Sequence, residues 1–169
     1  DAPTVIRWSK EKLPDPIEAV RTSGGVDVIV HDEQAEVLLV GHGQFMGLTI
    51  EVAKALTKQG VRVEVVDPLW SYPVNPTLVT MAAQHQLVVS LEDSMVVSGV
   101  GSHLSEAMRQ AAVDTPLMCF GIPQAFLAHG SRNQVLAECG LTAPDITREV
   151  LGRYLALQQP DEAVIDVQR

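Results

Sequence analysis

The chain has 169 residues, 46% of them hydrophobic, which is enough for one domain with a sizeable core. It carries 12 Lys and Arg residues against 21 Asp and Glu residues, a net charge of −9 at pH 7. This acidic balance excludes nucleic acid and anionic membranes as expected partners, because both select a basic surface. No apolar run approaches the ~18 residues that cross a bilayer, and no signal peptide is visible.

The first 24 residues differ in composition from the rest of the chain. Residues 3–8 (PTVIRW) predict a short strand, and residues 10–23 are rich in charge and proline, which is typical of a linker. A strand needs a sheet partner. Residues 3–8 therefore either pair with the main sheet or belong to a domain that this chain lacks.

The next segments predict one edge strand and one strand–helix–strand unit. Residues 25–31 alternate apolar and polar side chains, which favours an edge or antiparallel strand. Residues 37–40 are an apolar run typical of a strand buried on both faces, and a glycine-rich corner follows. Helical spacing over 48–58 and a strand over 61–67 complete a unit of the size of a right-handed parallel crossover.

Two more strands, with a helix before each, are predicted downstream. Asn75 is a good N-cap for a helix over 76–85, because Pro76 occupies its first position. Residues 86–91 predict the third core strand, which ends at Glu92 and Asp93. After a loop over 94–101, an amphipathic helix over 102–112 leads to a fourth core strand over 116–122.

The end of the chain predicts a turn over 123–130 and two helices. Ser131 caps a short helix that runs through Cys139, and Thr142 caps a final helix that ends near Leu157. Strands that alternate with helices predict a three-layer α/β/α domain with a five-stranded, mostly parallel sheet. Residues 26–31 are the expected antiparallel edge strand.

The two cysteines, Cys119 and Cys139, fall in a predicted strand and a predicted helix. Buried free thiols are the favoured interpretation, ahead of a disulfide or a metal pair. Free thiols are typical of a reducing compartment, so we expect a cytoplasmic protein. The first residue is not Met, which favours a chain that is processed, cut or a fragment.

The corner at Gly41–Gly47 has glycine spacing close to that of a dinucleotide-binding turn, with Asp67 at the end of the next strand. The bulky Phe45 and Met46 stand where such a turn needs small residues. A strand-to-helix corner whose glycines serve packing is the favoured interpretation. A Rossmann-type nucleotide-binding module at this corner remains one alternative function, and a non-catalytic interaction domain is another.

Two further features lie at predicted strand ends, where sites in open α/β sheets collect. Glu92 and Asp93 are suited to acid–base work, cation binding or capping of the following loop. His42 lies in the glycine corner and is a candidate site residue, whereas the other histidines favour surface or capping roles. No pair of histidines has metal-ligand spacing on one helix.

Five stretches follow one another along the chain: GGVDVIV, EVLLVGHGQF, VEVVDPLWSYPVNPTLVTMAAQHQLVVSLED, SGVGSHLSEAM and DTPLMCFGIPQAFLAHGSRNQVLAECGLTAPDI. In this order they resemble the C-terminal domain of 1-deoxy-D-xylulose-5-phosphate synthases, within the transketolase superfamily. The resemblance covers residue 3 to about residue 157, and its most specific part is GIPQAFLAHGSRNQVLAECGLTAPDI.

The resemblance implies a parent enzyme that condenses pyruvate with glyceraldehyde 3-phosphate, releases carbon dioxide and feeds isoprenoid and thiamine synthesis. It also implies a homodimer that uses thiamine diphosphate and magnesium, both bound by two domains absent here. Residues 1–24 are then a remnant of the preceding domain plus a linker, 25–157 the domain itself, and 158–169 a flexible tail. The chain alone is expected to be inactive, giving dimer contacts and one wall of a substrate channel.

The site residues that the resemblance implies are all substrate-binding, with no catalytic or metal-binding residue in this chain. Two departures from the family pattern bear on a phosphorylated substrate: Lys10 and Leu69 stand where the family has arginines. Lys10 keeps the charge without the planar fork, and Leu69 loses both. The expected substrate-binding residues are Lys10, His42, Gln44, Glu92, Asp93 and Ser94.

Overall fold

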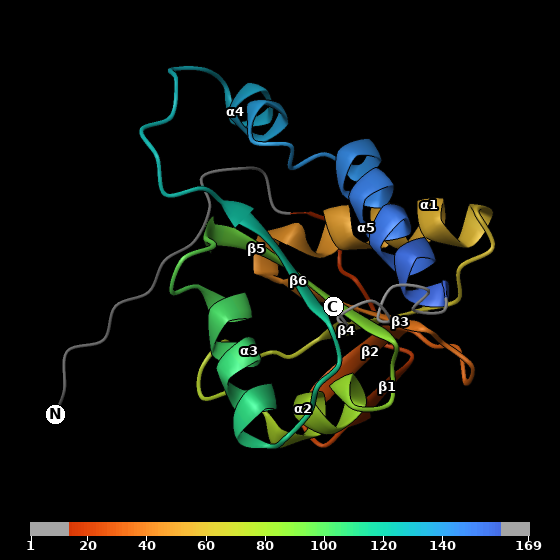
Figure 1. Cartoon of the computed structure of the whole chain (residues 1–169). Helices are drawn as coiled ribbons and strands as arrows, with labels where there is room; N and C mark the ends of the chain where they lie inside the picture. Colours follow the sequence, from red (N-terminus) through yellow and green to blue (C-terminus); the bar gives the residue numbers. More distant parts are fainter. Residues whose placement is uncertain (1–13, 160–169) are drawn as a thin grey trace, which may run out of the picture.

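The computed structural model describes residues 14–159, which form a sheet with helices on both faces (Figure 1). No helix in this part of the chain is long and apolar enough to cross a bilayer. The elements in chain order are β1 (Arg21–Ser23), β2 (Val26–Val30), β3 (Val37–His42), η1 (Gly43–Phe45), α1 (Met46–Lys58), β4 (Val63–Asp67), α2 (Pro76–Ala82), β5 (Leu87–Met95), α3 (Val100–Gln110), β6 (Leu117–Ile122), α4 (Arg132–Glu138) and α5 (Ala143–Gln158).

The sheet has six strands in the order β1-β2-β4-β3-β5-β6. Strands β3, β4, β5 and β6 are parallel, and β2 pairs antiparallel with β4, as predicted for residues 26–31. The strand–helix–strand unit β3–α1–β4 is confirmed as a parallel crossover. The mostly parallel, three-layer architecture inferred from the sequence is therefore confirmed.

The prediction of five strands was wrong, because β1 was missed. Strand β2 is antiparallel as predicted, but β1 and not β2 forms the edge of the sheet. Arg21–Ser23 pairs antiparallel with Val26–Val28 through a two-residue turn. Gly24 and Gly25 both have positive φ angles, +55° and +82°, which is the backbone of a hairpin turn that matches the strand twist. Only the last three residues of the run that favoured a linker, Arg21–Ser23, form a strand of this hairpin, so the sheet begins ahead of the boundary expected at residue 25.

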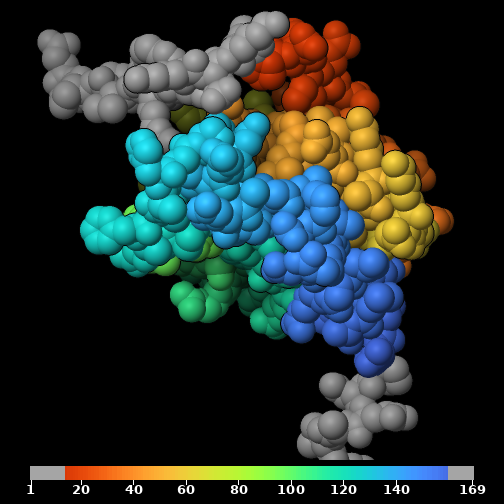
Figure 2. Space-filling view, turned by 90° about the horizontal axis from the view of Figure 1, so that it is seen from above, coloured from red at the N-terminus to blue at the C-terminus, as the bar shows by residue number. Residues whose placement is uncertain are grey.

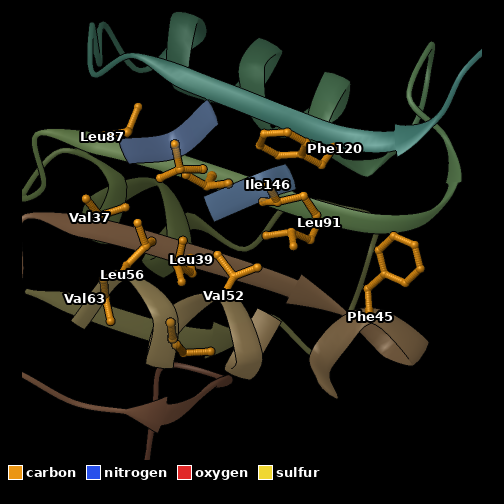
Figure 3. Close-up of a cluster of buried hydrophobic side chains, with 14 of the residues drawn as sticks. Val37, Leu39, Phe45, Val52, Leu56, Val63, Leu87, Leu91, Phe120 and Ile146 are labelled. Atoms are coloured by element: carbon orange, nitrogen blue, oxygen red, sulfur yellow. The ribbon is translucent and has the colours of Figure 1, made fainter. Parts of the chain in front are cut away.

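Two apolar clusters fill the two faces of the sheet. Alternate residues of β3 point to opposite faces: Val37 and Leu39 pack under α1 and α5, whereas Leu38 and Val40 pack under α2 and α3. All six residues of β3 are buried, as expected for a central parallel strand. Figure 3 shows the first cluster, with Phe45 at its margin. Figure 2 shows α1, α4 and α5 side by side on this face.

Helix starts followed the sequence more closely than helix and strand ends did. Asn75, Ser131 and Thr142 all cap helices with their side chains, as predicted. Helix α2 stops at Ala82 rather than at residue 85, and β5 continues through residue 95 where a loop was predicted. The strand predicted at residues 3–8 lies outside the described residues.

Candidate functional site at the carboxyl edge of the sheet

The parallel strands end together at one edge of the sheet, here called the carboxyl edge. His42 ends β3 and Asp67 ends β4, while Glu92, Asp93 and Ser94 lie in the last four residues of β5. His42 and Glu92 are direct partners in the β3–β5 register. Ligands of open α/β sheets bind outside this edge. The topology therefore brings four of the six predicted site residues together: His42, Glu92, Asp93 and Ser94.

The glycine corner is a packing corner. A Cβ atom at Gly41 would lie 2.7 Å from Thr49 Oγ1 and 2.9 Å from Met46 Cε, so glycine lets α1 approach β3. Phe45 and Met46 are buried and fill the space at the start of α1. The Asp67 carboxylate accepts a hydrogen bond from the Leu69 backbone N–H (2.8 Å). These contacts account for the spacing without a nucleotide.

His42 is 9% exposed, and its Nε2 is buried without a hydrogen-bond partner among the described residues. Burial lowers the pKa of His42, and the negative charges of Glu92 and Asp67 offset part of that effect. The imidazole is therefore neutral at pH 7. A neutral ring with one free polar atom can accept or donate a single proton or hydrogen bond at the site.

The lowered pKa of His42 predicts a pH dependence of stability. The unfolded chain binds a proton at this residue below about pH 6.5 while the folded chain does not, so stability should fall as the pH drops through that value. A His42→Asn variant should lose this dependence, whose slope cannot exceed about 1.4 kcal/mol per pH unit. Urea unfolding at pH 7.5 and 5.5 measures it, with His129→Asn as the exposed control. Identical slopes in wild type and His42→Asn would contradict the burial argument.

Glu92 is 1% exposed, and both of its carboxylate oxygens are occupied. Oε2 accepts from the Val100 N–H (2.8 Å) and from the Ser94 hydroxyl, and Oε1 accepts from the Gly101 N–H (3.0 Å). The carboxylate therefore caps the start of α3 from a neighbouring strand, where an anion is favoured. Glu92 and Ser94 therefore stabilise the backbone of the carboxyl edge, and their side-chain polar groups are already paired within the protein.

Asp93 anchors a residue that the sequence analysis missed. Arg132, the first residue of α4, contacts both Asp93 oxygens, at 3.0 Å from Nη2 and 3.2 Å from Nη1. Its guanidinium also lies 5.9 Å from the centre of the Phe45 ring. Arg132 thus brings a positive charge to the carboxyl edge. The sequence signalled Arg132 only through its position directly after Ser131, the predicted cap of the helix.

Two hollows flank these residues. Gln44 is exposed and lines a cavity of about 570 Å³ together with Gly43, Arg132 and Asn133. Ser94 lines a second hollow of about 390 Å³ with Tyr72, Met95 and His103. Lys10 lies outside the described residues, so its predicted place in the site stays a prediction.

The described residues hold no group of three His, Cys, Asp or Glu side chains that could bind a metal ion. Both cysteines are free thiols. Burial, and then the charge of Glu92, raises the pKa of Cys119 to about 11. Cys119 therefore stays protonated at neutral pH and is unsuited to nucleophilic chemistry.

Comparison with known proteins decides the family. The family model described as "Transketolase, C-terminal domain" matches residues 26–146. The chain belongs to the transketolase C-terminal domain family. It is 47% identical over 154 residues to 1-deoxy-D-xylulose-5-phosphate synthase 2 of Streptomyces avermitilis and 43% identical over 164 residues to the 1-deoxy-D-xylulose-5-phosphate synthase of Frankia casuarinae. The alignments cover 90% and 95% of this transketolase C-terminal domain but only 24% and 25% of those relatives.

Solved structures agree with this assignment. A split-gene transketolase in an inactive β4 tetramer superimposes with a TM-score of 0.71 at 26% identity, over 85% of this chain and 47% of that one. A transketolase from Campylobacter jejuni superimposes with a TM-score of 0.55 at 19% identity, over 80% of this chain and 20% of that one, which supports the fold alone. This transketolase C-terminal domain spans about a quarter of the length of the curated relatives it matches.

Proposed function

We propose that this chain is the C-terminal domain of a 1-deoxy-D-xylulose-5-phosphate synthase-like enzyme, and that its carboxyl edge forms one wall of the substrate channel. The parent would condense pyruvate with glyceraldehyde 3-phosphate, and this domain would also give contacts in a homodimer. The similarity to synthases over most of the chain supports the activity. His42 and Gln44, with the Asp93–Arg132 pair, are the groups this domain would turn toward the substrate.

The distribution of exposed apolar side chains supports the placement of the channel wall at the carboxyl edge. Among residues 14–159, seven of the ten large apolar side chains that are exposed lie at or just after the carboxyl ends of β4, β5 and β6. An isolated soluble domain gains nothing from a cluster of this kind, whereas a surface that other domains cover does. These residues, here called the carboxyl-edge patch, are Leu69, Trp70, Tyr72, Met95, Val97, Phe126 and Leu127.

The thiamine diphosphate and magnesium of the family do not fit the residues described here. The start of α1, the natural place for a diphosphate, borders the cavity that Gln44 lines, but Phe45 and Met46 are bulky where a diphosphate-binding turn needs small residues. Arg132 in that cavity is already paired with Asp93. No described cluster suits magnesium. We therefore assign both groups to the rest of the parent protein. Because β1 belongs to the sheet, we place the start of the domain at Arg21 rather than at the expected residue 25, and its end at the end of α5. The two free cysteines support a cytoplasmic location.

A chimera tests this proposal. The C-terminal quarter of the Streptomyces avermitilis synthase is replaced by this chain, and product formation from pyruvate and glyceraldehyde 3-phosphate is measured with both cofactors present. We expect an active chimera, and no turnover by this chain alone under the same conditions. A folded chimera that binds thiamine diphosphate without turnover would contradict the proposed function. Turnover by the isolated chain would contradict the assignment of the cofactors to other domains.

A further inference from the structure

Residues 123–140, between β6 and α5, lie on the outside of the domain (Figure 1). Phe120 of β6 and Leu141 ahead of α5 are buried in the larger apolar cluster. Between them, no residue from 123 to 140 is buried, although this segment includes helix α4. A helix of seven residues is too short to be stable by itself in water, so α4 depends on contacts with the rest of the domain.

One polar contact ties the start of α4 to the sheet. The two Nη atoms of Arg132 lie 3.0 and 3.2 Å from the Asp93 carboxylate oxygens, and the guanidinium lies over the Phe45 ring. A two-point contact of this kind fixes the orientation of the guanidinium as well as its place. Among the residues that the structure describes, it is the only hydrogen-bonded or ion-pair link between residues 123–135 and any residue outside the segment.

The second half of α4 meets the domain through apolar contacts. Leu136 and Cys139 are half-buried and pack against the larger cluster, and Gly140 follows with a positive φ of +70°. Glycine adopts this angle without strain, so the chain can turn sharply there. At the other end, Pro123 follows directly on the last residue of β6. The segment therefore has two defined ends, with Arg132 as the polar anchor between them.

The cavity of about 570 Å³ lies between this segment and the glycine corner. Arg132, Asn133 and Leu136 line it from the side of α4. Gly43 and Gln44 line it from the side of the corner. The cavity leaves room for α4 to move relative to the corner while the packed side chains of the core keep their places.

We propose that residues 123–140 form a flap on the wall of the substrate channel, and that Arg132 is its positioning residue. The pair with Asp93 holds the flap against the carboxyl edge, and this keeps Phe126 and Leu127 in the carboxyl-edge patch. Without the pair, α4 loses its polar anchor and the flap separates from the cavity, while the core stays folded. The role in the channel rests on the proposed function, whereas the anchoring of the flap does not.

Hydrogen exchange of the backbone amides in the full chain tests the anchor. In Arg132→Gln, the hydrogen-bonded amides of α4 should exchange at least about tenfold faster than in wild type, because a released helix of this length unravels. Asp93→Asn should have the same effect, and Arg132→Lys, which keeps the charge without the planar fork, a smaller one. Arg148→Gln is the matched control, because it breaks the Asp145–Arg148 pair on α5 and should leave α4 unchanged. Exchange in α4 that is the same in Arg132→Gln and wild type would overturn the flap.

Kinetics of the chimeric synthase test the positioning role. Release of the flap should raise the KM for glyceraldehyde 3-phosphate at least about threefold in both Arg132→Gln and Asp93→Asn, while kcat stays within about twofold. Direct binding of substrate by Arg132 predicts the opposite for Asp93→Asn, because the freed guanidinium would then lower KM. A lower KM in Asp93→Asn, or the same KM in all variants, would overturn the positioning role. A chimera without turnover would contradict the proposed function, and the exchange rates would still decide whether Arg132 anchors the flap.

Discussion

Glu92→Ala should lower the free energy of unfolding by about 3–5 kcal/mol, because it leaves buried donors unpaired at about 1–3 kcal/mol each. The Val100 and Gly101 N–H groups and the Ser94 hydroxyl all donate to this carboxylate. The surroundings have little room to rearrange. A Cβ atom at Gly99 would lie 2.2 Å from Glu92 Oε2, and one at Gly121 would lie 2.9 Å from Glu92 Cγ. The neighbouring backbone therefore packs directly against this side chain, and Glu92→Ala leaves a buried cavity in addition to the unpaired donors.

Urea unfolding measures this loss, with two comparison variants. Glu92→Gln keeps the side-chain shape but has one accepting oxygen, and should lose about 1–3 kcal/mol. Glu106→Ala makes the same chemical change at an exposed position of α3 and should stay within about 0.5 kcal/mol of wild type. If Glu92→Ala were as mild as Glu106→Ala, the carboxylate would not hold α3.

The sequence predicted most of the fold because its signals are local. Apolar runs gave the central strands, and Asn75, Ser131 and Thr142 gave the helix starts through side-chain caps that the structure confirms. Strand β1 was missed because three polar residues carry no periodic signal and form a strand only by pairing with β2. The end of β5 was missed for a related reason. Its polar residues favour a loop, yet Met95 still pairs with Ile122 of β6.

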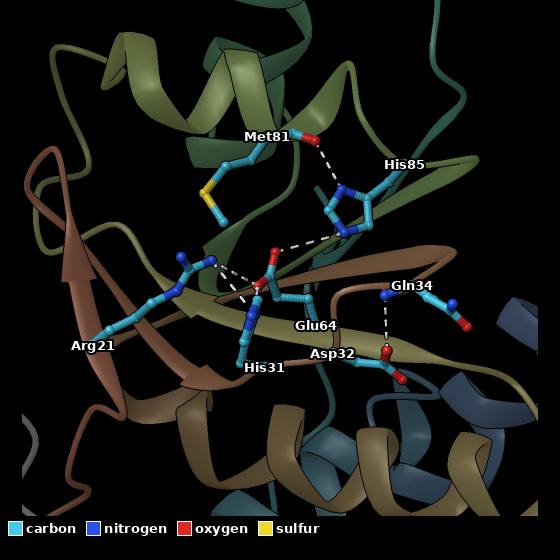
Figure 4. Close-up of polar contacts among 7 residues, drawn as sticks. All are labelled: Arg21, His31, Asp32, Gln34, Glu64, Met81 and His85. Atoms are coloured by element: carbon cyan, nitrogen blue, oxygen red, sulfur yellow. Dashed lines mark hydrogen bonds and ion pairs between the residues drawn. The ribbon is translucent and has the colours of Figure 1, made fainter.

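The candidate site was predicted in part for the same reason. Strand ends are visible in a sequence, so His42 and the Glu92–Ser94 run could be placed at one edge. Arg132 could not, because it reaches Asp93 across 39 positions of the chain. Glu64 of β4 and His85, which precedes β5, likewise lie 3.7 Å apart only because of the order of the strands (Figure 4). Contacts of this kind depend on topology, and no spacing rule in the sequence reports them.

Phe45→Ala should lower the free energy of unfolding by about 3–5 kcal/mol, the usual cost of removing a buried phenyl ring. Phe45 is 2% exposed at the margin of the larger apolar cluster, and Arg132 lies over its ring. The cavity would open at the corner that positions His42 and Gln44. We therefore expect the variant to disturb the packing of the carboxyl edge as well as that of the core. Urea unfolding measures the effect directly, as a midpoint at a lower urea concentration than in wild type.

Phe126→Ala is the matched control, because it removes the same ring from a fully exposed position in the loop that projects between β6 and α4 (Figure 1). In the isolated chain it should change stability by less than about 0.5 kcal/mol. In the chimeric synthase, by contrast, Phe126→Ala should have an effect. It should reduce turnover or dimer content, while the stability of the domain itself stays unchanged. An exposed ring that matters in neither setting would remove Phe126 from the carboxyl-edge patch. A ring that matters only in the assembled enzyme is what a surface covered by other domains requires.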